Sequence, residues 1–106
     1  MSTNRRPAGM VARRVRTSAG TFAPGWVAPP ASDQLRALGD AIYRRRALRG
    51  LTQVMLADRA GIGRQQVNRL ERGHWAPRLD TLWRIAGALE TCPSALLGDA
   101  EDALDG

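Results

Sequence analysis

The stretch LTQVMLADRAGIGRQQVNRLERG, residues 51–73, decides the fold. It divides at Gly61 into two segments that each place apolar residues at helical spacing, namely Leu56 and Ala57 before the glycine and Val67 and Leu70 after it. Thr52 is a good N-cap for the first segment, and Gly61 can adopt the left-handed backbone that ends it. Two helices that cross steeply need a small residue where their backbones meet, which suits Ala57. The stretch therefore predicts two short helices joined by a sharp turn.

The sequence on either side of the turn predicts further helices. The second helix of the pair should span residues 64–72, with Gly63 as its N-cap and Gly73 at its end. Another helix is expected over residues 33–48 with Asp33 as N-cap, a fourth from Pro77, and a short fifth from Pro93. The residues expected to face the core from these three helices are Leu35, Leu38, Ile42, Leu79, Leu82, Ile85, Ala86, Leu89, Leu96 and Leu97. Because no segment alternates with a period of two and β-branched residues are sparse, we predict an all-α bundle of five helices.

The composition narrows the function classes. The 106 residues suffice for one compact domain, with a formal charge of +6 in which all sixteen basic residues are arginine. An arginine-only repertoire is expected from a GC-rich genome, and it also suits forked contacts to phosphate and guanine. Cys92 and His74 are the only residues of their types, so we expect no disulfide, no metal site and no Cys/His nucleophile pair. The sequence offers no set of residues that would form a catalytic site, so we expect a protein that is not an enzyme and needs no cofactor. No apolar run is long enough to span a membrane, and none forms the core of a secretory signal, so we expect the protein to be cytoplasmic.

Charge divides the chain into three regions. Residues 1–32 hold five arginines and no acidic residue among scattered prolines, so most of this arm should be flexible. Residues 33–97 form the expected folded domain, with eleven arginines and six acidic residues. Residues 98–106 form an expected tail with four acidic residues and no basic one. The two ends are either solvated and inert, or the basic arm touches nucleic acid while the acidic end competes for the same arginines.

The predicted helix over residues 64–72 has an inward and an outward face. At 100° per residue, Val67, Leu70 and Glu71 point inward. The outward set, which contains no acidic residue, comprises Arg64 at the helix tip and then Gln65, Asn68, Arg69 and Arg72. Such a face could simply be solvated; alternatively, it could read DNA, because arginine pairs with the O6 and N7 of guanine and glutamine or asparagine pairs with the N6 and N7 of adenine.

Taken together, these features resemble the Cro/CI-type helix-turn-helix of the XRE family of transcriptional regulators. The resemblance covers about residues 35–97. Its matching features are Leu51-Thr52-Gln53, Leu56-Ala57, Gly61, Val67, Leu70, Glu71-x-Gly73, Pro77 and the series Leu82, Ile85, Ala86 and Leu89. It implies a five-helix bundle of the lambda-repressor-like DNA-binding type, whose third helix enters the major groove. By resemblance, the base-contacting positions are Arg64, Gln65 and Arg69, with Asn68 as an occasional addition.

The resemblance also implies a structural ion pair between Arg46 and Glu71, because an inward-facing carboxylate is costly without a cation. The alternative is that both are surface charges. Gln53 at the start of the second helix is expected to bind a DNA phosphate. The full set of expected phosphate contacts is Thr52, Gln53, Arg72, His74 and Arg78, and the expected contacts from the arm are Arg13, Arg14 and Arg16.

Several positions depart from the family pattern. Gly63 lacks the side-chain acceptor of the usual Ser or Thr cap, and Thr91 stands where an apolar residue is usual. Gly87 inside a helix suggests close packing. Trp75 either packs locally or joins Trp83 in an apolar patch that a partner covers.

We therefore expect a sequence-specific repressor that binds double-stranded DNA at a two-fold operator as a homodimer, with a dimer contact near Leu96, Leu97 and Leu104. A phage repressor, a restriction-modification controller and a toxin-antitoxin autorepressor all fit this description. The alternative is a protein-binding module, such as an antitoxin or anti-factor. Its arm, which contains Phe22, Trp26 and Val27, would fold on and mask a partner protein such as a toxin.

Overall fold

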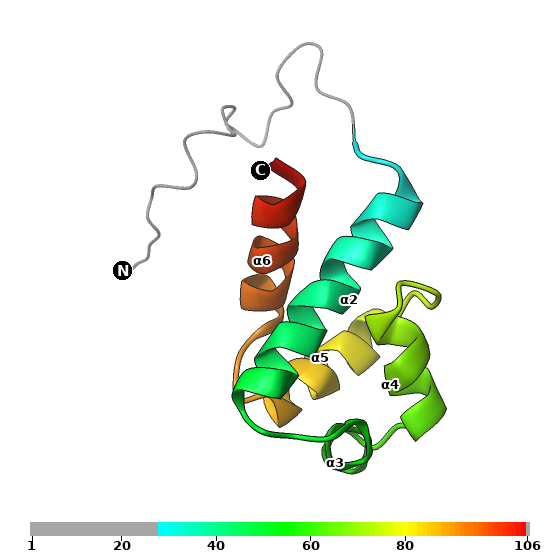
Figure 1. Ribbon diagram of the computed structural model, residues 1–106, viewed down its shortest axis with the longest axis vertical. Coiled ribbons are helices and arrows are strands. Elements are labelled where there is room, and N and C mark those ends of the chain that lie inside the picture. Colours follow the sequence, from blue (N-terminus) through cyan, green and yellow to red (C-terminus); the bar gives the residue numbers. More distant parts are fainter. Residues whose placement is uncertain (1–27, 106) are drawn as a thin grey trace.

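The computed structural model describes residues 28–105, which form five α-helices and no strand (Figure 1). In chain order the helices are α2 (Ala31–Leu48), α3 (Gln53–Ala60), α4 (Arg64–Glu71), α5 (Leu79–Ala88) and α6 (Pro93–Asp105). The predicted all-α, five-helix architecture is confirmed for this part of the chain.

The long helix α2 is the spine of the bundle. It packs along α6, which runs antiparallel to it, and on its other side it contacts α4 (Figure 1). Helices α3 and α4 pack on one another, and α5 closes the core between α3 and α6. As a result α3 and α4 lie together on one side of α2, and α6 lies on the other.

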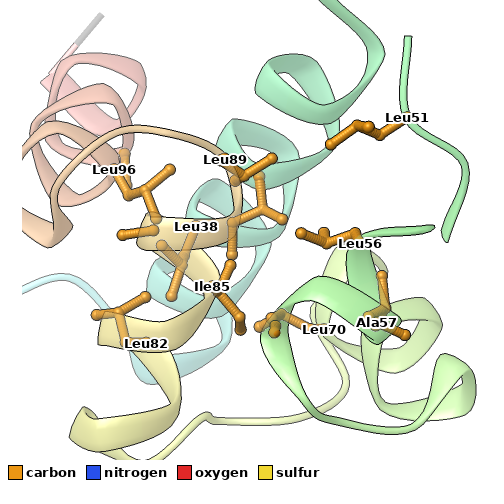
Figure 2. Close-up of a cluster of buried hydrophobic side chains, with 14 of the residues drawn as sticks. Leu38, Leu51, Leu56, Ala57, Leu70, Leu82, Ile85, Leu89 and Leu96 are labelled. Carbon is orange, nitrogen blue, oxygen red and sulfur yellow. The ribbon is translucent and has the colours of Figure 1, made fainter. Parts of the chain in front are cut away.

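The core is a single cluster of aliphatic side chains to which every helix contributes (Figure 2). Its most deeply buried large side chains are Ile42, Leu56, Val67, Leu70, Ile85, Leu89 and Leu96. Burial of such residues contributes about 1.5 to 3 kcal/mol each relative to exposure, so this cluster is what holds the short helices α3 and α4 in place.

The turn between α3 and α4 is built as the sequence predicts. Thr52 caps α3, because its hydroxyl oxygen accepts a hydrogen bond from the backbone N–H of Met55 at 3.1 Å. Gly61 ends α3 with φ of 73°, in the left-handed region. Gly63 is the N-cap of α4 and offers no side-chain acceptor, and the side chain of Gln66 satisfies another donor by accepting from the Gly63 N–H at 2.9 Å.

Four helix boundaries differ from the predictions, one of them by a single residue, since α4 ends at Glu71 and not at Arg72. Helix α2 begins at Ala31 with Pro30 as its N-cap, so Asp33 is not the cap but an acidic residue of the first turn. Helix α5 begins at Leu79, two residues after Pro77. Helix α6 is not short: it continues to Asp105, so the acidic residues expected in a separate tail lie on a helix that packs against α2.

Two leucines expected in the core are on the surface. Leu79, the first residue of α5, is 66% exposed. Leu97 is 45% exposed, whereas its neighbour Leu96 is fully buried, so only one of the two can face α2 and α5. Leu96 is thereby excluded from an intermolecular contact.

Close helix packing occurs at Gly39 rather than at Gly87. A Cβ atom at Gly39 would collide with the carbonyl oxygen of Leu70 and lie 2.8 Å from that of Glu71, because α2 crosses α4 there. A Cβ atom at Gly87 would meet nothing within 4 Å, so the expectation of close packing at Gly87 is wrong. The crossing at Gly39 sets how near α4 can approach the spine of the bundle.

Candidate nucleic-acid interface

The outward face of α4 presents polar and basic side chains to solvent. Arg64, Gln65 and Arg69 are exposed, while Val67 and Leu70 on the opposite face are fully buried. Within residues 28–105, no side-chain hydrogen bond or ion pair restrains these three exposed side chains. They remain available to a ligand. The fourth expected base-reading residue, Asn68, is partly buried and differs from them in this respect.

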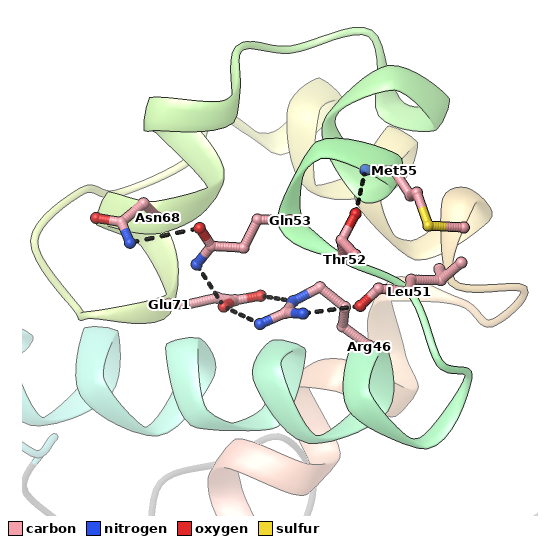
Figure 3. A network of polar contacts seen from close by, with 7 residues as sticks. All are labelled: Arg46, Leu51, Thr52, Gln53, Met55, Asn68 and Glu71. Atoms are coloured by element: carbon pink, nitrogen blue, oxygen red, sulfur yellow. Dashed lines mark hydrogen bonds and ion pairs between the residues drawn. The ribbon is translucent and has the colours of Figure 1, made fainter.

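A buried ion pair anchors the other face of α4 to α2 (Figure 3). Arg46 Nε donates to Glu71 Oε2 at 2.6 Å, and Arg46 Nη2 donates to Glu71 Oε1 at 2.8 Å. The Glu71 side chain is 5% exposed and that of Arg46 is 12% exposed, so the alternative of two surface charges is excluded. The hydrogen bond to Glu71 raises the pKa of Arg46, which keeps the guanidinium charged.

Arg46 makes two further contacts that fix its position. Its Nη1 donates to the backbone carbonyl of Leu51 at 2.8 Å, and its guanidinium lies 5.3 Å from the centre of the Tyr43 ring. The same side chain therefore ties α2 both to α4 and to the segment that leads into α3. Both helices of the pair are oriented by one cation.

Gln53 extends this network to the outward face (Figure 3). Its Nε2 donates to Glu71 Oε1 at 3.1 Å, and its Oε1 accepts from Asn68 Nδ2 at 3.5 Å. Gln53 was expected to contact phosphate, and its place at the first position of α3 is compatible with that role. Its link to Asn68 was not predicted, because no periodicity or spacing indicates which side chains meet between two helices.

The remaining expected phosphate contacts lie around these helices. Thr52 is exposed at the N-terminus of α3, and Arg72 and His74 are exposed directly after α4. Arg78 is also exposed, and its Nε lies 3.5 Å from Asp80 Oδ1 in a surface ion pair of the kind that contributes little to stability. Four of the five expected positions thus lie on the surface of the molecule, and Gln53 is half-buried between α3 and α4.

The two tryptophans, Thr91 and the N-terminal arm were the remaining positions with sequence-based expectations. Trp75 packs against the core, which favours local packing, while Trp83 is 60% exposed. Thr91 accepts a hydrogen bond from Arg45 Nη1 at 3.3 Å, which accounts for a polar residue at that position. The arm contacts of Arg13, Arg14 and Arg16 and the apolar residues of the proposed masking segment lie outside the described residues.

Among residues 28–105, no group of three or more His, Cys, Asp or Glu side chains could hold a metal ion. None of the helices described is long and apolar enough to cross a membrane.

The exposed basic face of α4 and the ion pair that anchors this helix to α2 are accompanied by a match to a known family. A family model for the helix-turn-helix family HTH_3 matches residues 42–97, more than half of the chain. The chain belongs to the HTH_3 family. The matched residues include α3 and α4, which form the helix-turn-helix. Helix α4 is the second helix of this motif.

Individual relatives agree with the family assignment. The immunity repressor protein of Bacillus phage phi105 is 40% identical over 62 residues, which are 58% of this chain and 43% of the repressor. The chain therefore spans less than half the length of that relative.

Solved structures give the same result. The restriction-modification controller protein C.AhdI from Aeromonas hydrophila is 32% identical, with a TM-score of 0.58, over 58% of this chain and 94% of C.AhdI. The clp gene regulator ClgR from Corynebacterium glutamicum is 26% identical, with a TM-score of 0.66, over 73% of this chain and 79% of ClgR. This HTH_3 domain thus shares its fold with a restriction-modification controller and a clp gene regulator.

Proposed function

We propose that this protein is a transcriptional repressor that binds a two-fold operator as a homodimer in the cytoplasm, with one α4 helix in the major groove of each half-site. The observation that carries the proposal is the exposed outward face of α4, which holds Arg64, Gln65 and Arg69 and no acidic residue. The similarity to a phage immunity repressor supports repression rather than activation.

The proposed roles follow from donor and acceptor chemistry. Arg64 and Arg69 can each donate two hydrogen bonds to guanine O6 and N7, and Gln65 can pair with adenine N6 and N7. Thr52 and Gln53 lie at the N-terminus of α3, where backbone N–H groups favour an anion, and they would bind phosphate. In the same way, the exposed side chains that follow α4, those of Arg72, His74 and Arg78, would fix the register of the domain on the duplex.

A homodimer is proposed because one domain of this size buries too little surface for tight specific binding. Two copies on half-sites about 34 to 36 Å apart provide the usual solution. Leu97 and Leu104 are partly exposed on α6 and are candidates for the contact between copies, since both present apolar area to solvent.

The test is DNA-binding affinity at about 150 mM salt, an ionic strength at which non-specific binding is weak. A preferred duplex is first selected from a random library with the wild-type protein. Arg64→Ala, Gln65→Ala and Arg69→Ala are then measured on that duplex by fluorescence anisotropy. Each variant is expected to lose about 1 to 3 kcal/mol of binding free energy and to relax the preference at one base pair.

Arg44→Ala is the matched control, because Arg44 is an exposed arginine on α2 that takes no part in the proposed contacts. It should bind the selected duplex nearly as the wild type does. If all three α4 variants bind the selected duplex with wild-type affinity, the assignment of base reading to α4 is wrong.

A further inference from the structure

The ion pair and the closest backbone contact of α4 both lie at its C-terminal end. Glu71, the last residue of the helix, accepts two hydrogen bonds from Arg46. Its backbone oxygen also lies against Gly39 of α2. Two of the residues proposed to read bases, Arg64 and Gln65, are at the opposite end of the helix. The position of these two side chains in a groove therefore depends on what fixes the N-terminal end of α4.

The turn that leads into α4 has a permissive backbone. Gly61 and Gly63 flank Ile62 in this turn, and glycine has more backbone freedom than any other residue. Gly63 has no side chain to cap the helix, and its N–H donates to Gln66 within α4 itself. Packing of Ile62 against the core is one restraint on the turn. A second restraint comes from α5.

The side chain of Arg84 connects α5 to this turn. Its Nη1 donates to the backbone carbonyl oxygen of Gly61 at 3.4 Å, and its Nη2 donates to the hydroxyl oxygen of Thr81 at 3.3 Å. Thr81 is only 5% exposed, so the group that holds the guanidinium is itself fixed in the bundle. Gly61 directly follows α3, where the partial negative charge of the helix C-terminus favours a cation. Within the described part of the chain, no other helix sends a hydrogen-bonding side chain to residues 61–63.

We propose that Arg84 is a positioning residue for DNA recognition: it fixes the turn between α3 and α4 and thereby sets where Arg64 and Gln65 enter the major groove. Side chains of a binding site must be held to within about 0.5 Å of the productive geometry. Arg69 lies near the end of α4 that Glu71 anchors, so its position depends less on the turn. This inference rests on the proposed function, because it assumes that α4 reads bases.

The consequence is a loss of base discrimination at one end of the recognition site. The base pairs read by Arg64, Gln65 and Arg69 are identified as those at which each alanine variant loses discrimination in a panel of single-base operator variants. Arg84→Met keeps the length of the side chain but removes the guanidinium. It should reduce discrimination about 3- to 10-fold at the base pairs of Arg64 and Gln65, the range for one hydrogen bond of modest strength. Discrimination at the base pair of Arg69 should stay within about twofold of the wild type.

Phosphate binding by Arg84 is the competing explanation, because this arginine is exposed. A lost phosphate contact would weaken every duplex alike and flatten the slope of log K against log salt by about 0.9. Positioning predicts an unchanged slope instead. Thr81→Val removes the hydroxyl that holds Arg84 but keeps every charge, and it should reduce discrimination at the same two base pairs. Arg44→Met makes the same substitution at an exposed arginine of α2 and should leave both the slope and the discrimination unchanged.

A measurement without DNA tests the restraint on the turn directly. The backbone N–H groups of Gln66 and Val67 donate to the carbonyl oxygen of Gly63, and that of Arg72 donates to Asn68 at the other end of α4. In the free protein, Arg84→Met should speed amide hydrogen exchange of Gln66 and Val67 about 3- to 10-fold. Exchange of the Arg72 amide should keep its wild-type rate.

The outcomes distinguish this inference from the proposed function. The positioning role is overturned if Arg84→Met weakens discrimination equally at all three base pairs or at none of them. Unchanged exchange of the Gln66 and Val67 amides overturns it as well. If the wild type discriminates at no base pair while Arg84→Met still speeds exchange, the proposed function fails and the restraint on the turn stands. Circular dichroism and the Tm of each variant verify that the helices are retained.

Discussion

Glu71 is the acidic residue of α4, and its position shows how single residues separate the two faces of that helix. It lies beneath the outward face, where its side chain is only 5% exposed, and it meets the guanidinium of Arg46. A carboxylate on the outward face would repel DNA phosphates; in its actual position it instead orients Gln53 and the cation of α2. Burial of this carboxylate therefore leaves the outward face of α4 without negative charge.

Removal of Glu71 should destabilise the fold strongly. Glu71→Leu leaves Arg46 buried without a counter-charge, and we expect the free energy of unfolding to fall by about 3 kcal/mol. The double variant Arg46→Met with Glu71→Leu should recover most of that loss, because an apolar pair of similar volume needs no desolvation of charge. Urea unfolding at pH 7 measures both. A single variant as stable as the wild type would contradict a structural role for the pair.

Cys92 should react as an acidified thiol. It precedes α6, and its Sγ lies 3.2 Å from Ser94 Oγ. This hydrogen bond, aided by the backbone N–H of Ala95, lowers the pKa of Cys92. Because a lower pKa means more thiolate at a given pH, the alkylation rate should reach half of its maximum at a lower pH than for an unperturbed cysteine.

The measurement is the rate of iodoacetamide modification as a function of pH. Ser94→Ala should move the midpoint of that profile upward, since it removes the largest cause of the shift. An unchanged midpoint in Ser94→Ala would show that the hydroxyl does not stabilise the thiolate.

At the scale of helices, two glycines in similar sequence surroundings have opposite expected effects. Gly39→Ala should lower the free energy of unfolding by about 1 to 3 kcal/mol, because the new methyl group meets backbone oxygens of α4 that cannot move independently. Gly87→Ala should raise it by about 0.5 to 1 kcal/mol, because the site is open and alanine favours the helix. Thermal unfolding of both variants provides the comparison. A Gly39→Ala protein as stable as the wild type would show that α2 and α4 can separate without cost.

These glycines also show what could be predicted from sequence and what could not. Periodicity indicated which face of each helix is apolar, and it placed Val67 and Leu70 correctly in the core. Cap chemistry located Thr52 and Gly61. Neither signal tells where two helices cross, so the close approach at Gly39 was missed and one was assigned to Gly87 instead.

The ends of helices were predicted least well, for a related physical reason. Asp33 is a good cap by residue type, but the chain is already helical from Ala31. Similarly, α6 continues beyond residue 97 because Ala100 is buried in the core and Asp99 pairs with Arg45 on α2 at 2.7 Å. Such tertiary contacts extend a helix through an acidic segment that composition alone marks as a tail.

At the scale of the whole molecule, charge is distributed unevenly over the bundle. Helix α6 carries four acidic residues and lies on the side of α2 opposite α4, whose exposed face is basic (Figure 1). Residues 28–105 hold eleven arginines and ten acidic residues, a net charge of 11 − 10 = +1, so the positive potential on the side of α4 comes from this separation more than from the net charge of the described part. Orientation of the domain toward DNA would follow from the separation as well as from the net charge.

The salt dependence of DNA binding distinguishes local contacts from net charge. For each phosphate contact that is lost, the slope of log K against log salt should become shallower by about 0.9, so Arg72→Ala should flatten the slope by roughly that amount. Glu101→Gln on α6 is the control, because it changes the net charge by one in the opposite sense at an exposed site on the far side of α2. If the slope depends on contacts made by the end of α4, only Arg72→Ala will change it. Alternatively, the slope could steepen in Glu101→Gln as much as it flattens in Arg72→Ala. That result would indicate that overall charge, and not the residues next to α4, sets the electrostatic part of DNA binding.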